Sequence, residues 1–293
     1  MLNTEKRNPK TLHIDQMKTI EMMQVISEEN FNAVKAVAAQ ITVIAKAVDE
    51  IAAALEHGGR LFYIGSGTSG RLAVADAAEC PPTFGVPQDL VTGIIAGGYN
   101  SLLHASETAE DSAENGKKDI LACHIKKEDI LVGISASGGA SYVLGAMEQA
   151  KLLGCTTIAL TCNENSPIDQ AGDIRICTDT GPEVITGSTR MKAGTAQKLV
   201  LNMLSTGVMV KLGKVYGNLM VDVKASNEKL RERCVRIVRQ ATGAEDAAAR
   251  AALIETNYAC KPAIVMLLLG VDKTRAETLL TRANGRVAAA LEG

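Results

Sequence analysis

The sequence predicts an α/β protein: a three-layer sandwich on a mostly parallel five-stranded sheet, followed by a small all-helical C-terminal subdomain. Short apolar runs, each followed by turn residues, alternate with longer helical stretches through the middle of the chain. The strand signals then stop near Lys224. The runs that we interpret as strands lie at 61–65, 90–96, 129–135, 156–162 and 174–178. Such a sheet is covered on both faces and binds ligands at the carboxyl ends of its strands.

Helical periodicity accounts for most of the remaining chain. Apolar residues recur at helical spacing within residues 16–57, and a longer helix fits 192–213. Glycine and proline then separate short helical stretches at 226–241, 243–254, 260–269, 272–282 and 284–292. We therefore expect an N-terminal helical segment at 1–57, a sheet domain at 58–223 and the helical subdomain at 224–293.

Composition excludes several classes of function. The 293 residues carry a net charge of −2 with a pI near 6.1, which argues against a nucleic-acid or polybasic membrane partner. No run approaches the roughly 18 apolar residues of a membrane span, and the first ten residues have no apolar signal region. The seven cysteines form no CxxC pair, and the four histidines have no metal-ligand spacing. We expect a cytoplasmic protein with buried thiols and no metal.

Two loops rich in glycine and serine are the first candidate site. The run GSGTSGR (65–71) follows an apolar strand and opens a helix, so that unpaired N–H groups and the helix dipole face an anion. The pattern recurs in LVGISASGG (131–139). The candidate phosphate ligands are Ser66, Thr68, Ser69, Ser135, Ser137 and Gly138. The alternative is a pair of serine-rich turns that only cap helices.

These loops match neither common nucleotide motif. A P-loop needs Lys followed by Ser or Thr after its last glycine, but Arg71 and Leu72 follow here. The letters of G-x-G-x-x-G fit residues 65–70, but the next strand ends in glycines without the carboxylate that binds a ribose. The three hydroxyls of 65–71 suit the phosphate of a small sugar better than a dinucleotide.

Acidic residues are the second candidate feature. Glu79 directly precedes Cys-Pro-Pro, and Pro81 disfavours helical geometry at Cys80, so we expect the helix to end there. A carboxylate in a last helical turn faces the negative end of the dipole, an arrangement that suits proton transfer better than a surface role. The run ETAEDSAE (107–114) places four acids on one helical face. Such a stripe is usually a solvated face, and spacing does not identify the member that faces a cleft.

A third loop, GPEVITGSTRMKAGTAQK (181–198), opens the predicted long helix and carries basic residues near the helix start. It suits an anion site or a subunit contact, and its candidate ligands are Thr186 and Ser188. Together with GSGTSGRLAVADAAECPPTFG (65–85), SASGG (135–139) and KLVLNMLSTGVMVKLGKVYGNLMVDV (198–223), it closely resembles the N-acetylmuramic acid 6-phosphate etherases, which contain a sugar isomerase (SIS) domain. The resemblance runs from about residue 58 onward.

The resemblance implies a lyase that cleaves the D-lactyl ether at C3 of a sugar phosphate by elimination and water addition, during peptidoglycan recycling. It places the proton-transfer residues of the family at Glu79 and Glu110 and implies no cofactor. It also implies a homodimer with its site near the contact, which agrees with the apolar character of helix 192–213.

Two other functions fit the same loops. A sugar-phosphate isomerase of this fold would not require both acidic motifs. A non-catalytic sensor resembling glucokinase regulatory protein would carry two such sheet domains, and a transcription regulator would need a basic helix-turn-helix at 1–50. The sequence has strands for one sheet only and shows no such N-terminal motif.

Overall fold

The computed structural model describes residues 1–104, 106–225 and 227–292, and of Glu107 it describes the backbone alone. The chain forms two compact units. One comprises Met1–Ala78 with Asp89–Ser205, and the other comprises Glu79–Gln88 with Thr206–Gly293. Two helices, α3 (Gly67–Phe84) and α8 (Lys192–Lys211), contribute residues to both units. The domain boundaries at 57 and 223 stay a prediction.

The first unit is built on a five-stranded parallel sheet, which confirms the predicted fold class. Its strands are β1 (Leu61–Gly65), β2 (Val91–Ile95), β3 (Ile130–Ser135), β4 (Thr156–Thr161) and β5 (Ile174–Cys177). The strand order is β2-β1-β3-β4-β5. The chain passes from β1 to β2 on one side and then crosses to β3 on the other. The direction of winding therefore reverses between β1 and β3, which makes this position the topological switch point.

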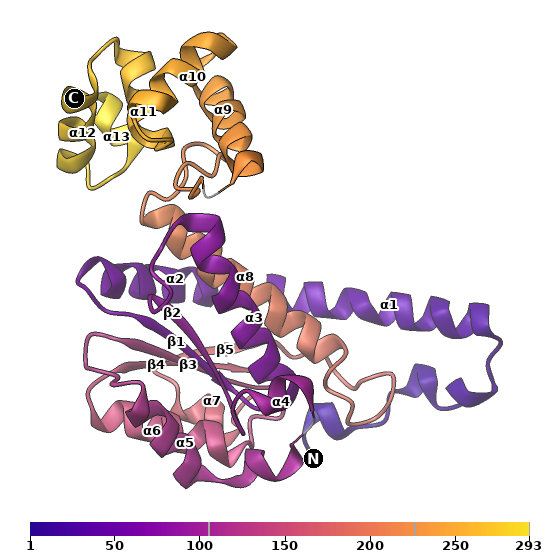
Figure 1. Ribbon diagram of the computed structural model, residues 1–293. Coiled ribbons are helices and arrows are strands. Elements are labelled where there is room, and N and C mark those ends of the chain that lie inside the picture. Colours follow the sequence, from indigo (N-terminus) through magenta and orange to yellow (C-terminus); the bar gives the residue numbers. More distant parts are fainter. Residues whose placement is uncertain (105, 226, 293) are drawn as a thin grey trace. The chain divides into compact units, whose positions relative to one another are not determined.

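Helices cover both faces of the sheet (Figure 1). Helices α2 and α8 lie above it in this view, and α5, α6 and α7 lie below. The helices of this region are α1 (Thr19–Ala38), α2 (Ile41–Glu56), α3 (Gly67–Phe84), α4 (Asn100–Leu103), α5 (Ala113–Ala122), α6 (Ser141–Leu152), α7 (Pro167–Ala171) and α8 (Lys192–Lys211). Short 3₁₀ helices occupy Asn3–Glu5, Pro9–Thr11, Ile14–Gln16 and Glu107–Asp111 (η4). Phe62 and Leu131 of the sheet pack with Tyr142 and Met147 of α6 in one continuous core.

Helix α3 does not end at Cys80 as the prolines predicted. It continues through Pro81 and Pro82 to Phe84, and the N–H of Gly85 still donates to the carbonyl of Pro81 at 2.9 Å. Each proline removes only its own N–H, so the bonds to the carbonyls four residues earlier are lost while the helical path is kept. Tertiary packing of this segment therefore outweighs the local preference.

The acidic run 107–114 is not one helical face. Residues Glu107–Asp111 form the 3₁₀ helix η4, and Ser112 then caps α5 by accepting the N–H of Asn115 at 3.2 Å. The break turns Glu110 and Glu114 in directions that a single α-helix would not give them. The prediction from the spacing of the acids, that all four share one helical face, is therefore wrong.

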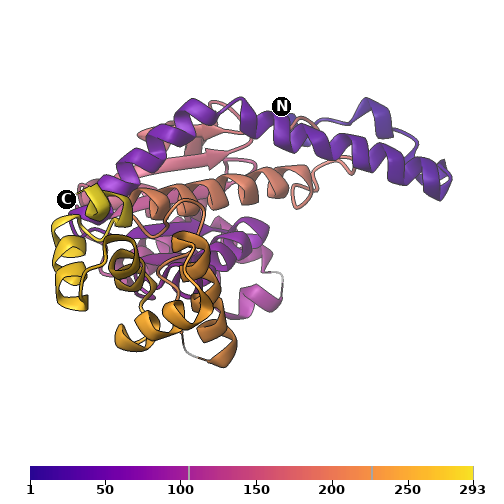
Figure 2. The ribbon, with the colours of Figure 1, turned by 90° about the horizontal axis from the view of Figure 1, so that it is seen from above.

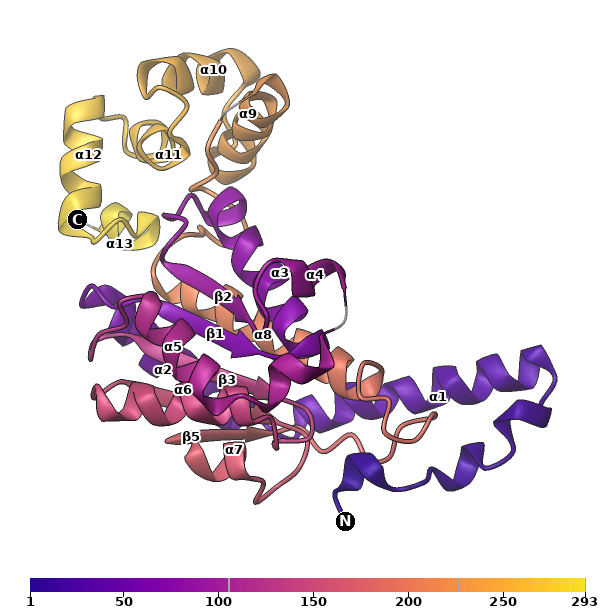
Figure 3. The same ribbon diagram turned by 60° about the horizontal axis from the view of Figure 1, so that its bottom comes forward.

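Helix α8 is buried within the chain. Its residues Val200, Leu201, Leu204, Val208 and Met209 are each at most 1% exposed. Much of the apolar surface that the sequence assigned to a subunit contact is therefore covered within the chain, but Leu199 and Met203 are half-buried and Val210 is 49% exposed. The homodimer stays a prediction. Four exposed apolar residues, Ile20, Met23, Phe31 and Val34, lie on α1, which extends beyond the edge of the sheet (Figures 2 and 3).

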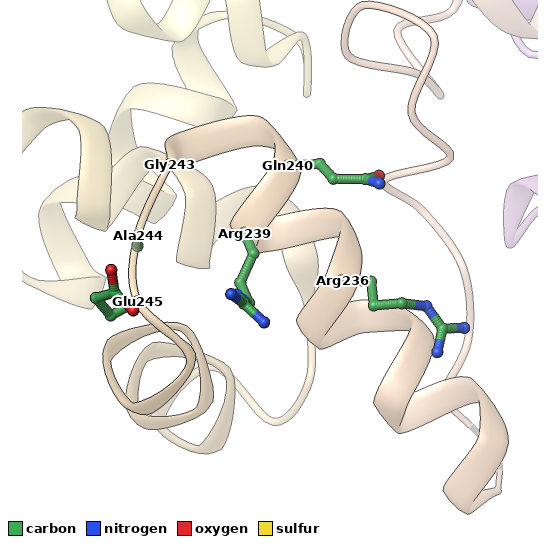
Figure 4. A pocket seen from close by; sticks show the side chains of 6 residues that line it. All are labelled: Arg236, Arg239, Gln240, Gly243, Ala244 and Glu245. Carbon is green, nitrogen blue, oxygen red and sulfur yellow. The ribbon is translucent and has the colours of Figure 1, made fainter.

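The second unit packs five helices around its own core: α9 (Glu228–Thr242), α10 (Asp246–Glu255), α11 (Cys260–Leu269), α12 (Lys273–Arg282) and α13 (Val287–Glu292). Asn227 and Asp272 cap α9 and α12 through their side chains. Gly243 ends α9 in the left-handed conformation, at φ 72°. A surface hollow of about 340 Å³ lies at this turn and includes Arg236 and Arg239 (Figure 4).

No single helix among the described residues is long and apolar enough to cross a bilayer, although α1 and α2 pass that test when joined across their 57° bend.

Candidate active site

The first serine loop joins β1 to α3. Gly67 opens the helix at φ 50°, and the N–H of Gly70 donates to the carbonyl of Ser66 at 3.2 Å. A Cβ at Gly65 would lie 2.7 Å from the nitrogen of Gly70, so the strand end and the helix start approach too closely for a side chain. Ser66 and Ser69 are both buried, and Thr68 is half-buried. The glycines thus bring backbone N–H groups and hydroxyls together at one point.

The second serine loop joins β3 to α6. The hydroxyl of Ser135 accepts the N–H of Gly138 at 3.1 Å, and that of Ser137 accepts the N–H of Gly139 at 3.2 Å. Gly138 has φ 74°, and a Cβ there would lie 2.0 Å from Oγ of Ser166. The backbone donors of this loop are therefore held by neutral hydroxyls.

The sheet brings these two loops together. β1 and β3 are hydrogen-bonded neighbours, with Gly65 opposite Ile134, so both loops leave the carboxyl edge at adjacent strands. This is also the switch point, where open α/β sheets bind their ligands. Ser66, Thr68 and Ser69 on one side and Ser135, Ser137 and Gly138 on the other thus flank one position in the fold.

Glu110 reaches the first loop from η4. Its Oε2 accepts a hydrogen bond from the hydroxyl of Ser66 at 3.1 Å. Arg71 of α3 donates to the carbonyls of Leu102 and His104, which fixes the segment that leads to η4. Among the described acidic side chains of the 107–114 run, Glu110 is the one that has a hydrogen bond to the first loop; residue spacing alone did not distinguish it.

Glu79 is an exposed residue of α3, in its C-terminal part. At 1.5 Å of rise per residue, about 18 Å of helix separates it from Gly67 at the loop. That length exceeds a single sugar phosphate.

In the third loop, which precedes α8, an acidic side chain of the loop itself accepts the N–H groups at the start of the helix. The carboxylate of Glu183, which is fully buried, accepts the N–H groups of Lys192 at 3.1 Å and Ala193 at 2.9 Å. Burial raises the pKa of Glu183, and the two N–H donors and Lys192 oppose that rise. Thr186 is exposed and Ser188 is half-buried on the outer part of this loop. In the described part of the chain, no hydrogen bond joins either one to a serine loop, and their role in ligand binding stays a prediction.

Lys192, one of the basic residues that the sequence offered to an anion, is already paired. Lys192 is 1% exposed, and its Nζ donates to Oε2 of Glu29 at 2.6 Å and to the carbonyl of Pro182 at 2.7 Å. Burial alone would raise the pKa of Glu29, but hydrogen bonds from Lys192, Lys10 and Asn8 lower it to about 2. Sequence reasoning missed this cluster because Glu29 and Lys192 lie far apart along the chain.

Helices α3 and α8 are joined by buried polar contacts beside the first loop. Ser69 donates to Oε1 of Gln197 at 2.9 Å, and Oδ1 of Asp76 accepts from Asn202 at 2.6 Å and from Ser205 at 3.2 Å. Burial raises the pKa of Asp76 against those hydrogen bonds. These contacts fix the start of α3. Among the described residues, no group of three or more His, Cys, Asp or Glu side chains is placed to hold a metal ion.

The family comparisons agree with this arrangement. The N-terminal SIS domain of glucokinase regulatory protein matches residues 43–151, the SIS domain matches 102–207, and the C-terminal lid domain of glucokinase regulatory protein matches 217–267. A phosphoheptose isomerase from Francisella tularensis has the same fold, with a TM-score of 0.50 at 23% identity over 66% of this chain and 98% of that one. The chain is a SIS-domain protein.

Relatives that match over nearly the whole chain identify a narrower family. The chain is 53% identical to the N-acetylmuramic acid 6-phosphate etherase of Serratia proteamaculans, over 99% of this chain and 98% of that protein. It is 52% identical to the etherase of Caldanaerobacter subterraneus subsp. tengcongensis, over 99% and 95%, and 54% identical to that of Aeromonas hydrophila, over 96% and 95%. The chain belongs to the N-acetylmuramic acid 6-phosphate etherase family.

Proposed function

We propose that this protein is an N-acetylmuramic acid 6-phosphate etherase, a carbon–oxygen lyase that releases D-lactate and N-acetylglucosamine 6-phosphate. Identity above 50% to etherases over nearly the whole chain carries this assignment. The two serine loops at the switch point supply the phosphate site that the substrate requires. We further propose that the reaction serves peptidoglycan recycling in the cytoplasm, where the seven free cysteines remain reduced.

The chemistry needs two proton-transfer groups. The ether at C3 is β to the C1 aldehyde once the sugar ring opens. A base removes the C2 proton, the C3–O bond breaks, and an acid protonates the departing lactate oxygen. Water then adds to the unsaturated aldehyde. The aldehyde of the substrate is the electron sink, so the proposal includes no cofactor.

We assign Glu110 as the base at C2 and Glu79 as the acid at the lactate oxygen; the exchanged assignment is the alternative. The contact between Glu110 and Ser66 supports the first role, because it ties a carboxylate to the phosphate loop. Glu79 lies in the E-C-P-P motif that the etherases share. The serine ligands Ser66, Thr68, Ser69, Ser135, Ser137 and Gly138 would hold the phosphate between the starts of α3 and α6.

We also propose that the active unit is a homodimer in which Glu79 serves the site of the second subunit. The helical distance between Glu79 and its own loop supports this division. Helix α1 offers a surface for the contact, because Ile20, Met23, Phe31 and Val34 are 47 to 64% exposed and recur on one helical face. Exposed apolar rows of this kind mark interfaces in many proteins.

Release of D-lactate from N-acetylmuramic acid 6-phosphate tests the activity. We expect turnover of the phosphorylated sugar and very poor turnover of unphosphorylated N-acetylmuramic acid. A protein that interconverts aldose and ketose phosphates without lactate release would be an isomerase. One that binds the sugar phosphate and leaves it unchanged would be a sensor.

Mixing two inactive variants tests the shared site. Glu79→Gln and Glu110→Gln chains that exchange subunits should give mixed dimers with one intact site each. These are about half of an equal mixture, so activity should return to about a quarter of the wild type. No recovery, or a fully active protein that sediments as a monomer, would place both acids in one chain.

A further inference from the structure

The part of α3 that carries Glu79 belongs to the helical unit. Residues Glu79–Gln88 cluster with Thr206–Gly293, whereas the start of the same helix clusters with the sheet. Contacts made by the helical unit therefore determine the position of the acid's backbone.

The end of α3 is held by a close contact with one residue of that unit. Gly85 follows the helix at φ 66°, and its ideal Cβ would lie 2.2 Å from the carbonyl oxygen of Asp222. A side chain at Gly85 would collide with backbone, which cannot move aside as a side-chain end can. The position of the Asp222 backbone therefore limits where α3 ends.

The Asp222 side chain is itself held by two lysines. Its Oδ2 lies 2.6 Å from Nζ of Lys261, which is in the first turn of α11, and 3.1 Å from Nζ of Lys214, which follows α8. The three side chains are only 12 to 27% exposed. Burial lowers the pKa of Lys261, and the hydrogen bond and charge of Asp222 oppose that shift. Asp222 thus joins the ends of α3 and α8 to the start of α11.

We propose that Asp222 is a positioning residue for Glu79: its ion pairs fix the backbone against which α3 ends, and so fix the acid that the proposed reaction requires. This inference rests on the proposed function. It assigns Asp222 no contact with substrate. A displacement of about 1 Å at a reacting group is enough to lower turnover by up to about 100-fold.

Asp222→Asn tests the proposal through the split between kcat and KM. We expect kcat for lactate release to fall about 10- to 100-fold while KM for the sugar phosphate stays within about 3-fold, because the phosphate loops lie in the other unit. Asp246→Asn is the matched control. Asp246 also pairs with two cations of the helical unit, Arg239 and Arg250, but lies on α10, and its variant should retain wild-type kcat.

A double-mutant cycle separates positioning from general loosening. If Asp222 acts through Glu79, Asp222→Asn should lower kcat in the wild type but cost less than about 2-fold more in a Glu79→Gln background. Equal fold losses in both backgrounds, or a rise in KM that matches the fall in kcat, would overturn the proposal. Wild-type kcat in Asp222→Asn would also overturn it.

Lys214→Gln is a milder second variant, because it keeps the ion pair between Lys261 and Asp222. It should also lower kcat, but by a smaller factor. If Asp222→Asn does not fold, the cycle is run with Lys214→Gln, and unchanged kcat there would equally reject the idea. Failure of the proposed function gives a different result, because the wild type itself would then release no lactate. If only the role of Glu79 is wrong, Glu79→Gln would retain full lactate release.

Discussion

The loop before α6 and the loop before α8 are both rich in glycine and hydroxyl residues, but they satisfy the backbone differently. Before α6, neutral hydroxyls of Ser135 and Ser137 accept the N–H groups of Gly138 and Gly139. Before α8, the buried carboxylate of Glu183 accepts the first N–H groups of the helix. A hydroxyl can rotate away to let a phosphate accept those donors, whereas a fixed negative charge repels the phosphate. The two loops therefore have similar compositions but different contacts. These contacts favour a ligand site in the loop before α6 and not in the loop before α8.

The largest expected effect concerns the two acids of the proposed mechanism, which would act on a ligand at the serine loops. Glu79→Gln and Glu110→Gln should each lower the rate of lactate release about 10²- to 10⁴-fold, because an amide keeps the shape but cannot exchange a proton. Glu114→Gln, an exposed residue of α5, should stay within a few-fold of wild type. A wild-type rate for Glu110→Gln would remove the base from the proposed mechanism.

The next effect concerns the loop before α8 and is one of stability. Glu29→Gln leaves the buried Lys192 without its anion and should lower the free energy of unfolding at pH 7 by about 3–5 kcal/mol in urea titrations. Lys10→Gln, which removes only an exposed partner of Glu29, should cost less than about 1 kcal/mol.

The pH dependence of the same pair has a definite sign. Because the folded-state pKa of Glu29 is about 2, below its ordinary value of 4.5, its stabilisation is present above pH 4.5 and is lost as the pH falls toward 2. The stability difference between wild type and Glu29→Gln should therefore shrink over that range. A difference that stays constant down to pH 2 would contradict the ion pair as its source.

Serine substitutions compare the two loops directly. Ser137→Ala should raise KM for the sugar phosphate about 10- to 100-fold, because hydrogen bonds to a charged group contribute about 1.5–3 kcal/mol. Ser188→Ala lies in the loop before α8, where Glu183 accepts the backbone N–H groups. This variant should change KM for the sugar phosphate by less than about 3-fold. Equal effects from the two variants would mean that the loop before α8 also holds the ligand, as the sequence suggested for Thr186 and Ser188.

The smallest expected effect concerns the hydrogen bonds by which Glu183 accepts the first N–H groups of α8. Glu183→Gln keeps one acceptor for Lys192 and Ala193 but removes the charge, and we expect a loss of about 1 kcal/mol in the free energy of unfolding. KM should not change. A large rise in KM with unchanged stability would show that Glu183 belongs to the ligand site.

The strands and the serine loops could be predicted because their signals are local. Each strand is a short apolar run bounded by turn residues, and the observed strands lie inside the predicted ranges. The C-terminal helices follow glycine and proline boundaries in the same way, and α11 has the predicted bounds.

What sequence reasoning missed depends on contacts between distant residues. The helical path of α3 through Pro81 is one example, because local preferences alone would end the helix there. The contact of Glu110 with Ser66 is another: the resemblance placed a proton-transfer residue at Glu110, but residue spacing did not show that it reaches the loop. The buried pair of Glu29 and Lys192 left no local pattern at all. Periodicity also did not show which apolar residues of α8 are buried, as Val208 and Met209 are, and which are exposed, as Val210 is.

The division of α3 between two units also has a consequence for the order of synthesis. Residues Glu79–Gln88 pack with a segment that begins at Thr206, so more than a hundred residues must be made before this piece of helix meets its neighbours. Closing so long a loop is slow relative to local helix formation, and domains generally fold from the N-terminus during translation. The nascent sheet unit would therefore emerge with its phosphate loops formed and with the end of α3 unpacked. A ribosome-bound chain would therefore form the proposed phosphate site before Glu79, the proposed acid, is packed in place.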